Sequence, residues 1–447
     1  MAPRYAGGQA CTECHAKIHS TVIGTDHAQA FAALKQIGQD TNPDCLPCHT
    51  VGYGLPTGFV SESATPQLAG VQCESCHGPS ARHMASEFNP RTRPLVDTAG
   101  NFCGACHTTN SVTASMPPQL AALHQPVHND WSLSEHASLD ITTNFTSASQ
   151  INSCDRCHSG SARISLVTNR SLPVRTNAWV AIGCPVCHDP HAEHVWTNVL
   201  AGIIYTNQLR NPLSSTNNYF LTTTDTFKKK YDPNINICGQ CHNHRGASYL
   251  TSDRPPHHSP QYNILLGDFN DLNTGLPHYE PGTHALAITN QCTDCHMQVT
   301  ASGGILSAVP RHTFTVDSLE ICKRCHGSFP DVLLKVVQGA ITNQIEQVKF
   351  DLDFWASTWA ATNSATSSLW VKYKTLTWEY TNPGELSPPG SVGPNATEQK
   401  RIPDLIKKAR FNLYLVLHDG SLGVHNPNYI AGLLDDAENY IEQQLNE

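Results

Sequence analysis

The pattern Cys-x-x-Cys-His occurs nine times in this 447-residue chain, and the nine copies use all 18 of its cysteines. This spacing is typical of c-type haem attachment, because two thiols bond to the porphyrin and the adjacent imidazole becomes the proximal ligand of the iron. The sequence therefore predicts nine covalently attached c-type haems. The copies consist of Cys11, Cys14 and His15; Cys45, Cys48 and His49; Cys73, Cys76 and His77; Cys103, Cys106 and His107; Cys154, Cys157 and His158; Cys184, Cys187 and His188; Cys238, Cys241 and His242; Cys292, Cys295 and His296; and Cys322, Cys325 and His326.

Two other uses of paired cysteines fit this pattern less well. A zinc ribbon combines two Cys-x-x-Cys motifs in one site and needs no histidine after each of them. A disulfide framework gives no reason for nine identical spacings. Because no cysteine lies outside the motifs, haem attachment is the interpretation that accounts for all of them.

The number of haems limits the kind of core that the chain can build. Nine haems leave about fifty residues for each, which is too few for a conventional side-chain core around every cofactor. We therefore expect the porphyrins to form the core, with helices and loops wrapped around them. The predicted fold class is mainly α with extensive irregular loops, a nonahaem cytochrome c built around a packed haem chain, with long C-terminal helices and little or no β-sheet.

The motifs divide the chain into three expected regions. Residues 1–110 hold four motifs and form an N-terminal tetrahaem region, and residues 111–330 hold five more in a pentahaem core. Residues 331–447 hold none and are expected to form a haem-free helical region that packs on the last haems. A coiled-coil dimer seam is the competing interpretation of these helices, so the sequence leaves a monomer and a dimer open.

Regular structure is expected mainly in that third region. Residues 331–380 contain no proline and carry apolar side chains at helical spacing, which predicts one long helix or two. Further helices are expected over residues 404–417 and 428–445, after a break rich in Pro and Gly. The inserts at 196–237 and 246–290 are rich in Asn, Thr and Pro and are interpreted as surface loops with little regular structure.

Charge and hydropathy exclude some partners. The net charge is −9, and haem propionates would make the protein more acidic, which argues against nucleic acid as a partner. No run of 18 apolar residues is present, so no membrane span is expected. Because c-type haem is attached outside the cytoplasm in bacteria, we expect an exported protein, in mature form with its signal peptide removed, at the cell surface, in the cell wall or in the periplasm.

Each haem iron has a second axial position, and 16 of the 25 histidines lie outside the nine motifs. Because 16 exceeds nine, histidine could ligate every iron, and counting does not reveal an open one. His27, His136 and His284 each follow a polar residue and precede Ala at the start of a plausible helical turn, so we expect them to be distal ligands. His83, six residues after His77, is a fourth candidate. Roles as ligand, as exposed residue or as propionate partner stay open for His191, His194, His257 and His258.

The later motifs resemble, in order and spacing, those of the ammonia-forming pentahaem nitrite reductases and their octahaem hydroxylamine oxidoreductase and tetrathionate reductase relatives. The similarity is carried by Ile182-Gly183-Cys184, Gly282-Thr283-His284, Arg311-His312 and Gly423-Val424-His425-Asn426-Pro427. That family uses four histidines as distal ligands. By position, the resemblance assigns this role to His136, His284, His312 and His425.

The same resemblance implies an active site at the first haem of the pentahaem set, which corresponds to Cys154–His158. It implies His278 as a distal catalytic histidine and Arg163 as a catalytic arginine, placed to donate protons or to stabilise negative charge. This chain has His158 where the nitrite reductases have a proximal lysine, and it lacks their tyrosine after the third motif. The octahaem relatives also keep a histidine at the first of these positions.

The first 110 residues resemble the tetrahaem cytochromes that serve hydroxylamine oxidoreductases. This similarity lies in Gly8-Gln9-Ala10-Cys11 and in Gly70-Val71-Gln72-Cys73. Four haems in front of a pentahaem core also resemble the cell-surface nonahaem terminal reductases of Gram-positive metal-reducing bacteria. That resemblance implies delivery of respiratory electrons to minerals and soluble shuttles.

Three functions follow as hypotheses. The first is a terminal reductase that takes electrons from redox partner cytochromes and passes them to ferric minerals, quinone shuttles or small nitrogen oxides. The second is a nitrite or hydroxylamine reductase with an open haem at Cys154–His158. The third is a filament subunit with haems stacked across protomers, which the haem-free residues after His326 make less natural.

Overall fold

The computed structural model is mainly helical, with long connections and very short strands in the part of the chain that it describes. It forms two compact units, one of Met1–Pro212 with Cys295–Asp317 and one of Leu213–Asp294 with Ser318–Glu447. The three haem-based regions expected from the sequence are a different division and stay a prediction. The described residues are 4–108, 116–121, 123–138, 154–169, 180–198, 203–210, 212–213, 236–245, 247–250, 254–267, 282–299, 301–302, 305–306 and 309–447.

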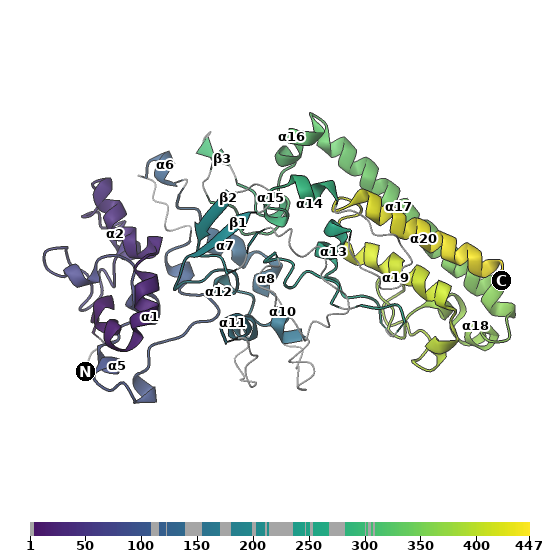
Figure 1. Ribbon diagram of the computed structural model, residues 1–447, viewed down its shortest axis with the longest axis horizontal. Coiled ribbons are helices and arrows are strands. Elements are labelled where there is room, and N and C mark those ends of the chain that lie inside the picture. The colour runs from purple at the N-terminus through teal and green to yellow at the C-terminus, as the bar shows by residue number, and fades with distance from the viewer. Residues whose placement is uncertain are drawn as a thin grey trace. The chain divides into compact units, whose positions relative to one another are not determined.

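The first unit consists of short helices at and between the attachment motifs (Figure 1). Its helices are α1 (Thr12–Val22), α2 (Asp26–Gln36), α3 (Leu46–His49), α4 (Cys73–His77), α5 (Ala81–Met84), α6 (Pro118–Ala121), α7 (Val127–Ser132), α8 (Glu135–Ser138), α10 (Arg156–His158), α11 (Gly160–Asn169) and α12 (Cys184–Cys187). Single 3₁₀ turns lie at Gly8–Cys11, Pro66–Leu68, Pro90–Thr92 and Cys103–Ala105. α15 (Cys292–His296) spans the boundary between the two units in the sequence.

Two short antiparallel hairpins supply the strands of the described residues. β1 (His194–Asn198) pairs with β2 (Ile203–Asn207), with His194 opposite Asn207, and β3 (Ala301–Ser302) pairs with β4 (Ile305–Leu306). The first hairpin lies partly in the 196–237 insert that was expected to be a loop. Its strands are rich in β-branched and aromatic residues, which favour this structure.

The second unit contains the long helices. They are α13 (Gln261–Leu266), α14 (Thr283–Ala287), α16 (Lys323–His326), α17 (Pro330–Trp355), α18 (Ser367–Tyr373), α19 (Asp404–Asp419) and α20 (Pro427–Leu445). A π-helical turn at Ala356–Ala360 extends α17, and 3₁₀ turns lie at Glu320–Cys322, Lys374–Trp378 and Glu398–Arg401.

A side-chain core joins α17, α19 and α20, which lie side by side (Figure 1). Leu352, Trp355, Leu413, Ile430 and Leu433 are fully buried in it. This region holds no attachment motif, so apolar side chains have to supply the buried volume that haems supply elsewhere. The region after the last motif therefore packs as a conventional helical bundle.

The sequence predicted these three helices closely, and the expected mainly helical fold with extensive loops and long C-terminal helices is confirmed. The long helix starts at Pro330, where a first-turn proline fits because its missing N–H would have no partner there. The other two helices agree with the expected ranges 404–417 and 428–445 to within two residues. The packing of this region on the last haems stays a prediction, as does the competing dimer seam.

Asn426 caps α20, because its side-chain oxygen accepts a hydrogen bond from the backbone N–H of Tyr429 at 3.3 Å. Asn426→Ala should lower the free energy of unfolding by about 1 kcal/mol, because that N–H then loses its partner. Thermal or guanidinium unfolding followed by circular dichroism measures the change. Asn428→Ala, an exposed position in the first turn of the same helix, is the control and should change stability by less than about 0.5 kcal/mol.

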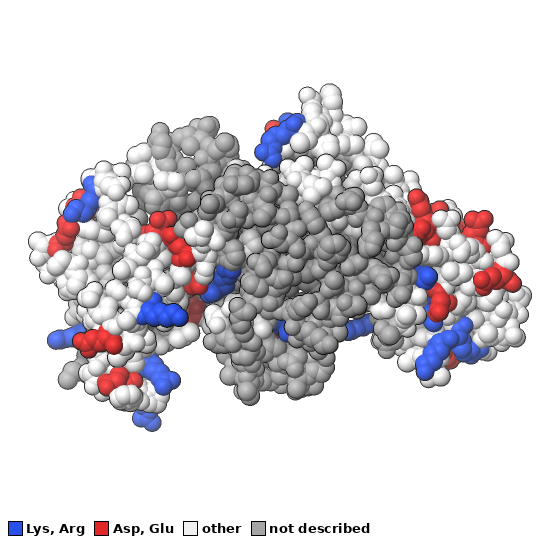
Figure 2. All heavy atoms as spheres, viewed as in Figure 1, with Lys and Arg blue, Asp and Glu red and all other residues white. Residues whose placement is uncertain are grey.

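No helix among the described residues is both long and apolar enough to cross a membrane. On the face shown in Figure 2, the acidic and basic side chains of the described residues are interspersed. The described residues on this face form no broad basic patch.

Candidate haem-binding sites

Most attachment motifs of the described residues lie on a single helical turn. α4, α12 and α15 each begin at the first cysteine of a motif, and α3 and α16 each end at the motif histidine. Residues three apart on one turn share a face, so the two thiols of a motif point to the same side. The histidine that follows then lies beside them. This arrangement lets one porphyrin meet both thiols while its iron meets the imidazole.

The variable residues inside a motif can fix its position, as Glu74 shows. Its buried carboxylate accepts hydrogen bonds from the backbone N–H groups of Ala6 (2.8 Å), Gly7 (2.7 Å) and Ser80 (2.6 Å). These donors lie before and after the motif in the sequence. Hydrogen bonds to a charged acceptor are stronger than neutral ones, so Glu74 ties the N-terminal segment to the third motif.

Five motif histidines each face one histidine from outside the motifs. An imidazole nitrogen binds a metal at about 2 Å, so two imidazoles on opposite sides of one iron place their ring centres about 6 Å apart. Ordinary edge-to-face contacts cover the same range of distances, but they would not select one motif and one non-motif ring in all five cases. The pairs and their centroid distances are His107–His27 (6.2 Å), His49–His124 (6.2 Å), His77–His191 (6.1 Å), His188–His312 (6.3 Å) and His326–His284 (5.9 Å).

Hydrogen bonds fix the orientation of several of these rings. A backbone carbonyl only accepts, so an Nδ1 that faces one must carry the proton and leaves the lone pair on Nε2 for a metal. The Nδ1 atoms that donate in this way belong to His49 (to Ala30 O, 2.8 Å), His77 (to Leu95 O, 2.5 Å), His124 (to Leu120 O, 2.7 Å), His284 (to Val424 O, 2.8 Å), His296 (to Phe314 O, 3.1 Å) and His312 (to Pro310 O, 2.9 Å).

Desolvation favours the neutral form of the paired rings. It lowers the pKa of His188 to about 4, with further contributions from the neighbouring His312 and His107. Burial also lowers the pKa of His27 and His49. A metal ligand must be the neutral imidazole, so these surroundings suit ligation at neutral pH.

Three of the expected distal histidines take part in the pairs. His27, His284 and His312 each lie opposite a motif histidine. His27 and His284 are the second residues of α2 and α14, and His136 is the second residue of α8, so the expected helical turns are present in all three cases. The ring of His136 lies edge-on to Phe314, with centroids 4.6 Å apart.

The surroundings of the other two expected ligands, His425 and His83, differ. Nδ1 of His425 donates to the buried carboxylate of Asp419 at 2.7 Å, which holds the ring in one orientation. This carboxylate–histidine contact is typical of ligating histidines. Nδ1 of His83 is buried without a hydrogen-bond partner among the described residues, and so is Nε2 of His128. Nε2 is the nitrogen that the other rings direct toward a metal, so the unpartnered Nε2 of His128 suits a ligand, whereas the unpartnered Nδ1 of His83 supports none by itself.

Sequence reasoning did not assign His124, which faces His49, and left His191, which faces His77, undecided. His191 lies three residues after the sixth motif, a spacing comparable with that of His83 after the third, so a signal was present. His124 stands between Leu123 and Gln125 without a repeated context. Only the tertiary fold brings it to its partner.

Thiols of different motifs also lie within hydrogen-bonding reach of one another. Contact with Cys106 lowers the pKa of Cys48 to about 7, and burial together with contact with Cys73 raises the pKa of Cys11 to about 12. Once haem is attached, these sulfurs are thioethers and no longer carry a titratable proton. What remains is the geometric result that cysteines of different motifs are in contact. The contacting pairs are Cys11–Cys73, Cys48–Cys106, Cys103–Cys184 and Cys238–Cys292.

The structure describes only one of the two proposed catalytic residues. Arg163 lies on α11, which begins shortly after the fifth motif, and the residue is 5 % exposed. His278 lies outside the described residues. Their arrangement around the haem of Cys154–His158 therefore stays a prediction.

These observations match the requirements of c-type haem. One helical turn presents two thiols and an imidazole, and a second imidazole stands at the distance of an opposite axial ligand in five cases. Covalent haems account for both features, whereas zinc or disulfides account for none of the ring pairs.

Comparison with known proteins supports the same conclusion. The family model "Cytochrome c554 and c-prime" matches residues 10–78. Cytochrome c-554 of Nitrosomonas europaea is 33% identical over 134 residues, which cover 23% of this chain and 57% of that protein. The multiheme cytochrome MtrA of Shewanella baltica is 23% identical over 169 residues, 33% of this chain and 46% of that protein. The chain thus spans about half the length of these curated relatives.

Two solved structures share the fold over nearly the whole chain. The outer cell wall cytochrome OcwA superposes with a TM-score of 0.58 at 18% identity, covering 98% of this chain and 99% of that one. The undecaheme cytochrome from the S-layer of Carboxydothermus ferrireducens gives a TM-score of 0.53 at 16% identity, covering 99% of this chain and 70% of that one. Together with the motifs and the ring pairs, these findings identify the chain as a multihaem c-type cytochrome, related to cytochrome c-554 and folded like OcwA.

Proposed function

We propose that this protein carries nine c-type haems and passes respiratory electrons along them to acceptors outside the cell, as a terminal reductase at the cell surface. When bound, each haem supplies an iron centre that exchanges one electron. The chain's own residues set the spacing of these centres and fill their axial positions.

The contacts between thiols of different motifs carry this proposal. In the first unit, they join motif one to motif three, motif two to motif four and motif four to motif six. Cys76 of the third motif also lies close enough to Cys103 of the fourth for the two thiols to interact electrostatically. Porphyrins bonded to these sulfurs would bring the edges of haems on contacting motifs next to one another. Five haems of this unit would then form one connected set.

The ring pairs support electron transfer over substrate turnover at the haems concerned. Two histidine ligands occupy both axial positions of an iron, which leaves no place for a substrate and gives a low potential. Five motif histidines have such an opposite ring. Haems of this kind can exchange electrons only through their edges, which suits acceptors that do not enter a pocket.

The similar proteins support the location and the class of acceptor. OcwA is an outer cell wall cytochrome, and the undecaheme protein comes from an S-layer. We propose that this chain is likewise exported and lies in the cell wall, with cytochromes as electron donors and ferric minerals or quinone shuttles as acceptors.

A second candidate function concerns the haem of Cys154–His158. The buried residue Arg163 lies on α11, which begins shortly after this motif, and a buried cation suits a small anion such as nitrite. The second proposal is reduction of nitrite or hydroxylamine at this haem, with Arg163 and His278 as the residues that bind the anion and supply protons.

Stopped-flow reoxidation of the reduced holoprotein separates the two functions. Quinone analogues and ferric oxide should reoxidise all haems quickly and completely, whereas nitrite and hydroxylamine should act slowly. Arg163→Ala and His278→Ala should leave the reactions with quinone and iron unchanged. Fast multi-electron turnover of nitrite to ammonia, lost in both variants, would instead establish the second function.

A further inference from the structure

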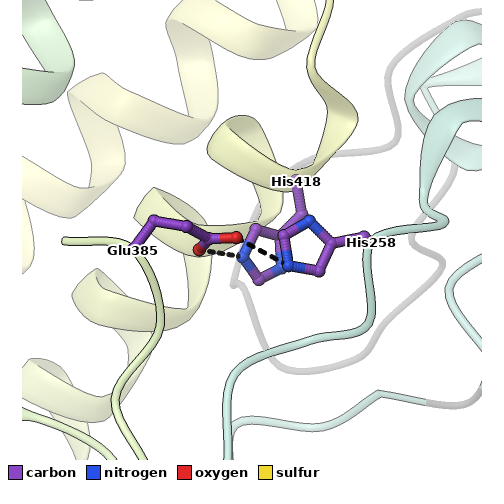
Figure 3. A group of neighbouring side chains, drawn as sticks. All are labelled: His258, Glu385 and His418. Carbon is purple, nitrogen blue, oxygen red and sulfur yellow. Dashed lines mark hydrogen bonds and ion pairs between the residues drawn. The ribbon is translucent and has the colours of Figure 1, made fainter. Parts of the chain in front are cut away.

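A cluster of three side chains in the second unit lies apart from the histidine pairs. His258 precedes α13, Glu385 belongs to the Pro- and Gly-rich segment after α18, and His418 lies in the last turn of α19. Figure 3 shows the carboxylate of Glu385 directed at the two imidazoles. Neither ring of this cluster is paired with a motif histidine, so the cluster is distinct from the five ring pairs described above.

The distances within the cluster are those of a small ligand set. Nε2 of His258 lies 2.7 Å from Oε1 of Glu385, and Nε2 of His418 lies 3.0 Å from Oε2. One ligand atom from each residue lies within 4.8 Å of the others. A metal ion bonded at about 2 Å to each of these atoms would replace the direct nitrogen–oxygen contacts.

A hydrogen bond at the nitrogen that faces away from the cluster fixes the orientation of the His418 ring, as is typical of ligating histidines. Its Nδ1 donates to the backbone oxygen of Pro256 at 2.7 Å, and the side chain is 2% exposed. Because a carbonyl only accepts, the proton is held on Nδ1 and Nε2 is left to face the cluster. Burial and this hydrogen bond hold Nε2 in one position.

Hydrogen bonding alone accounts poorly for this arrangement. Both Nε2 atoms face an acceptor-only carboxylate, so each ring would have to donate a proton to the same group. His418 would then donate from both nitrogens and be positively charged, while its ring is stacked on His258 with centroids 3.6 Å apart. A cation held between the two Nε2 atoms and the carboxylate would use both lone pairs and remove the need for those protons.

We propose that His258, Glu385 and His418 bind a divalent first-row transition-metal ion of the zinc class, separate from the haem irons. Two imidazoles and one carboxylate form a ligand set that zinc takes when it keeps a fourth position for water. Bound there, the ion would tie the segment before α13 and the loop after α18 to the end of α19. This inference does not depend on the proposed electron-transfer function.

Metal content of the holoprotein tests the proposal. The protein is treated with a chelator, loaded with Zn²⁺, dialysed and analysed for zinc per haem iron. Wild type should retain one more zinc per chain than His258→Ala or Glu385→Gln. Both side chains are more than half exposed, at 60% and 52%, so these variants should fold. His257→Ala is the matched control, since its Nδ1 faces the hydroxyl of Ser259, and it should retain zinc like wild type.

X-ray absorption at the zinc edge provides an independent readout, because haem iron does not contribute there. The wild-type spectrum should show two imidazoles and oxygen at about 2.0–2.1 Å, and this signal should disappear in Glu385→Gln. Equal zinc content in wild type and both ligand variants would overturn the proposal, as would a zinc spectrum without imidazole. An unchanged haem spectrum in all variants would show that the haems remain intact.

Discussion

Replacing His312 with methionine should raise the midpoint potential of one haem by a few tenths of a volt, within the span of about 0.8 V that axial ligands cover. A sulfur ligand opposite histidine favours ferrous iron more than a second imidazole does. The ring of His312 faces His188 with centroids 6.3 Å apart, and its Nδ1 is held by the carbonyl of Pro310. Potentiometric titration followed by haem absorbance would show one step moving to higher potential.

His258→Met is the control for this change, because its ring stacks on His418 and faces no motif histidine. It should leave every haem potential in place, even if it removes a zinc ion. An unchanged titration of His312→Met would contradict ligation by His312. A shift of all haems together would indicate a general loosening of the fold instead.

Arg410→Met should destabilise the second unit by about 3–5 kcal/mol, since it removes a buried cation from a polar network. Arg410 is 1% exposed, and its guanidinium donates to the carbonyls of Trp378 (2.7 Å) and Glu379 (2.8 Å) and to the side chain of Gln399 (2.8 Å). It also lies 3.9 Å from the ring centre of Tyr380. Methionine fills part of the volume, but the carbonyl of Trp378 and the side-chain oxygen of Gln399 lose their donor, whereas the carbonyl of Glu379 keeps the bond from Nε2 of Gln399. The midpoint of guanidinium unfolding, followed by circular dichroism, measures the loss.

The loss in Arg410→Met should depend on pH because of Glu379. Burial raises the pKa of this carboxyl, against hydrogen bonds from Ser387 and Tyr414 and the charge of Arg410. Without the cation the pKa rises further, so the folded state holds a proton that the unfolded state has released. Stability then falls as pH rises between the ordinary carboxyl pKa and the raised one. The variant should therefore be less impaired at about pH 5 than at about pH 7.

Lys400→Met removes an exposed cation outside the network and should change stability by less than about 0.5 kcal/mol. A similarly small effect for Arg410→Met would show that the buried network contributes little to the free energy of unfolding. A deficit that grows as pH falls would contradict the role assigned to Glu379.

The local features of this molecule could be predicted from the sequence. Each motif needs only one turn of chain, and the long helices follow from apolar spacing and the absence of proline. The positions of His27, His136 and His284 near helix starts were predictable because the preceding polar residues favour such starts. These are short-range properties, and the structure agrees with them.

The pairing of histidines could not be predicted in the same way. His124 meets the motif histidine His49, and His191 meets His77, across long stretches of chain. No local pattern encodes such a partner, since it depends on how the motifs pack together. The cluster of His258, Glu385 and His418 is a similar case, because its three members come from separate segments.

The most direct test of the account is a count of haem irons and of their axial ligands in the purified holoprotein. Iron analysis and the haemochrome spectrum should give nine haems per chain. Paramagnetic resonance of the oxidised protein should show low-spin bis-imidazole signals for at least the five haems whose histidines are paired. Fewer than nine haems, or mainly high-spin iron, would contradict a haem chain built for electron transfer.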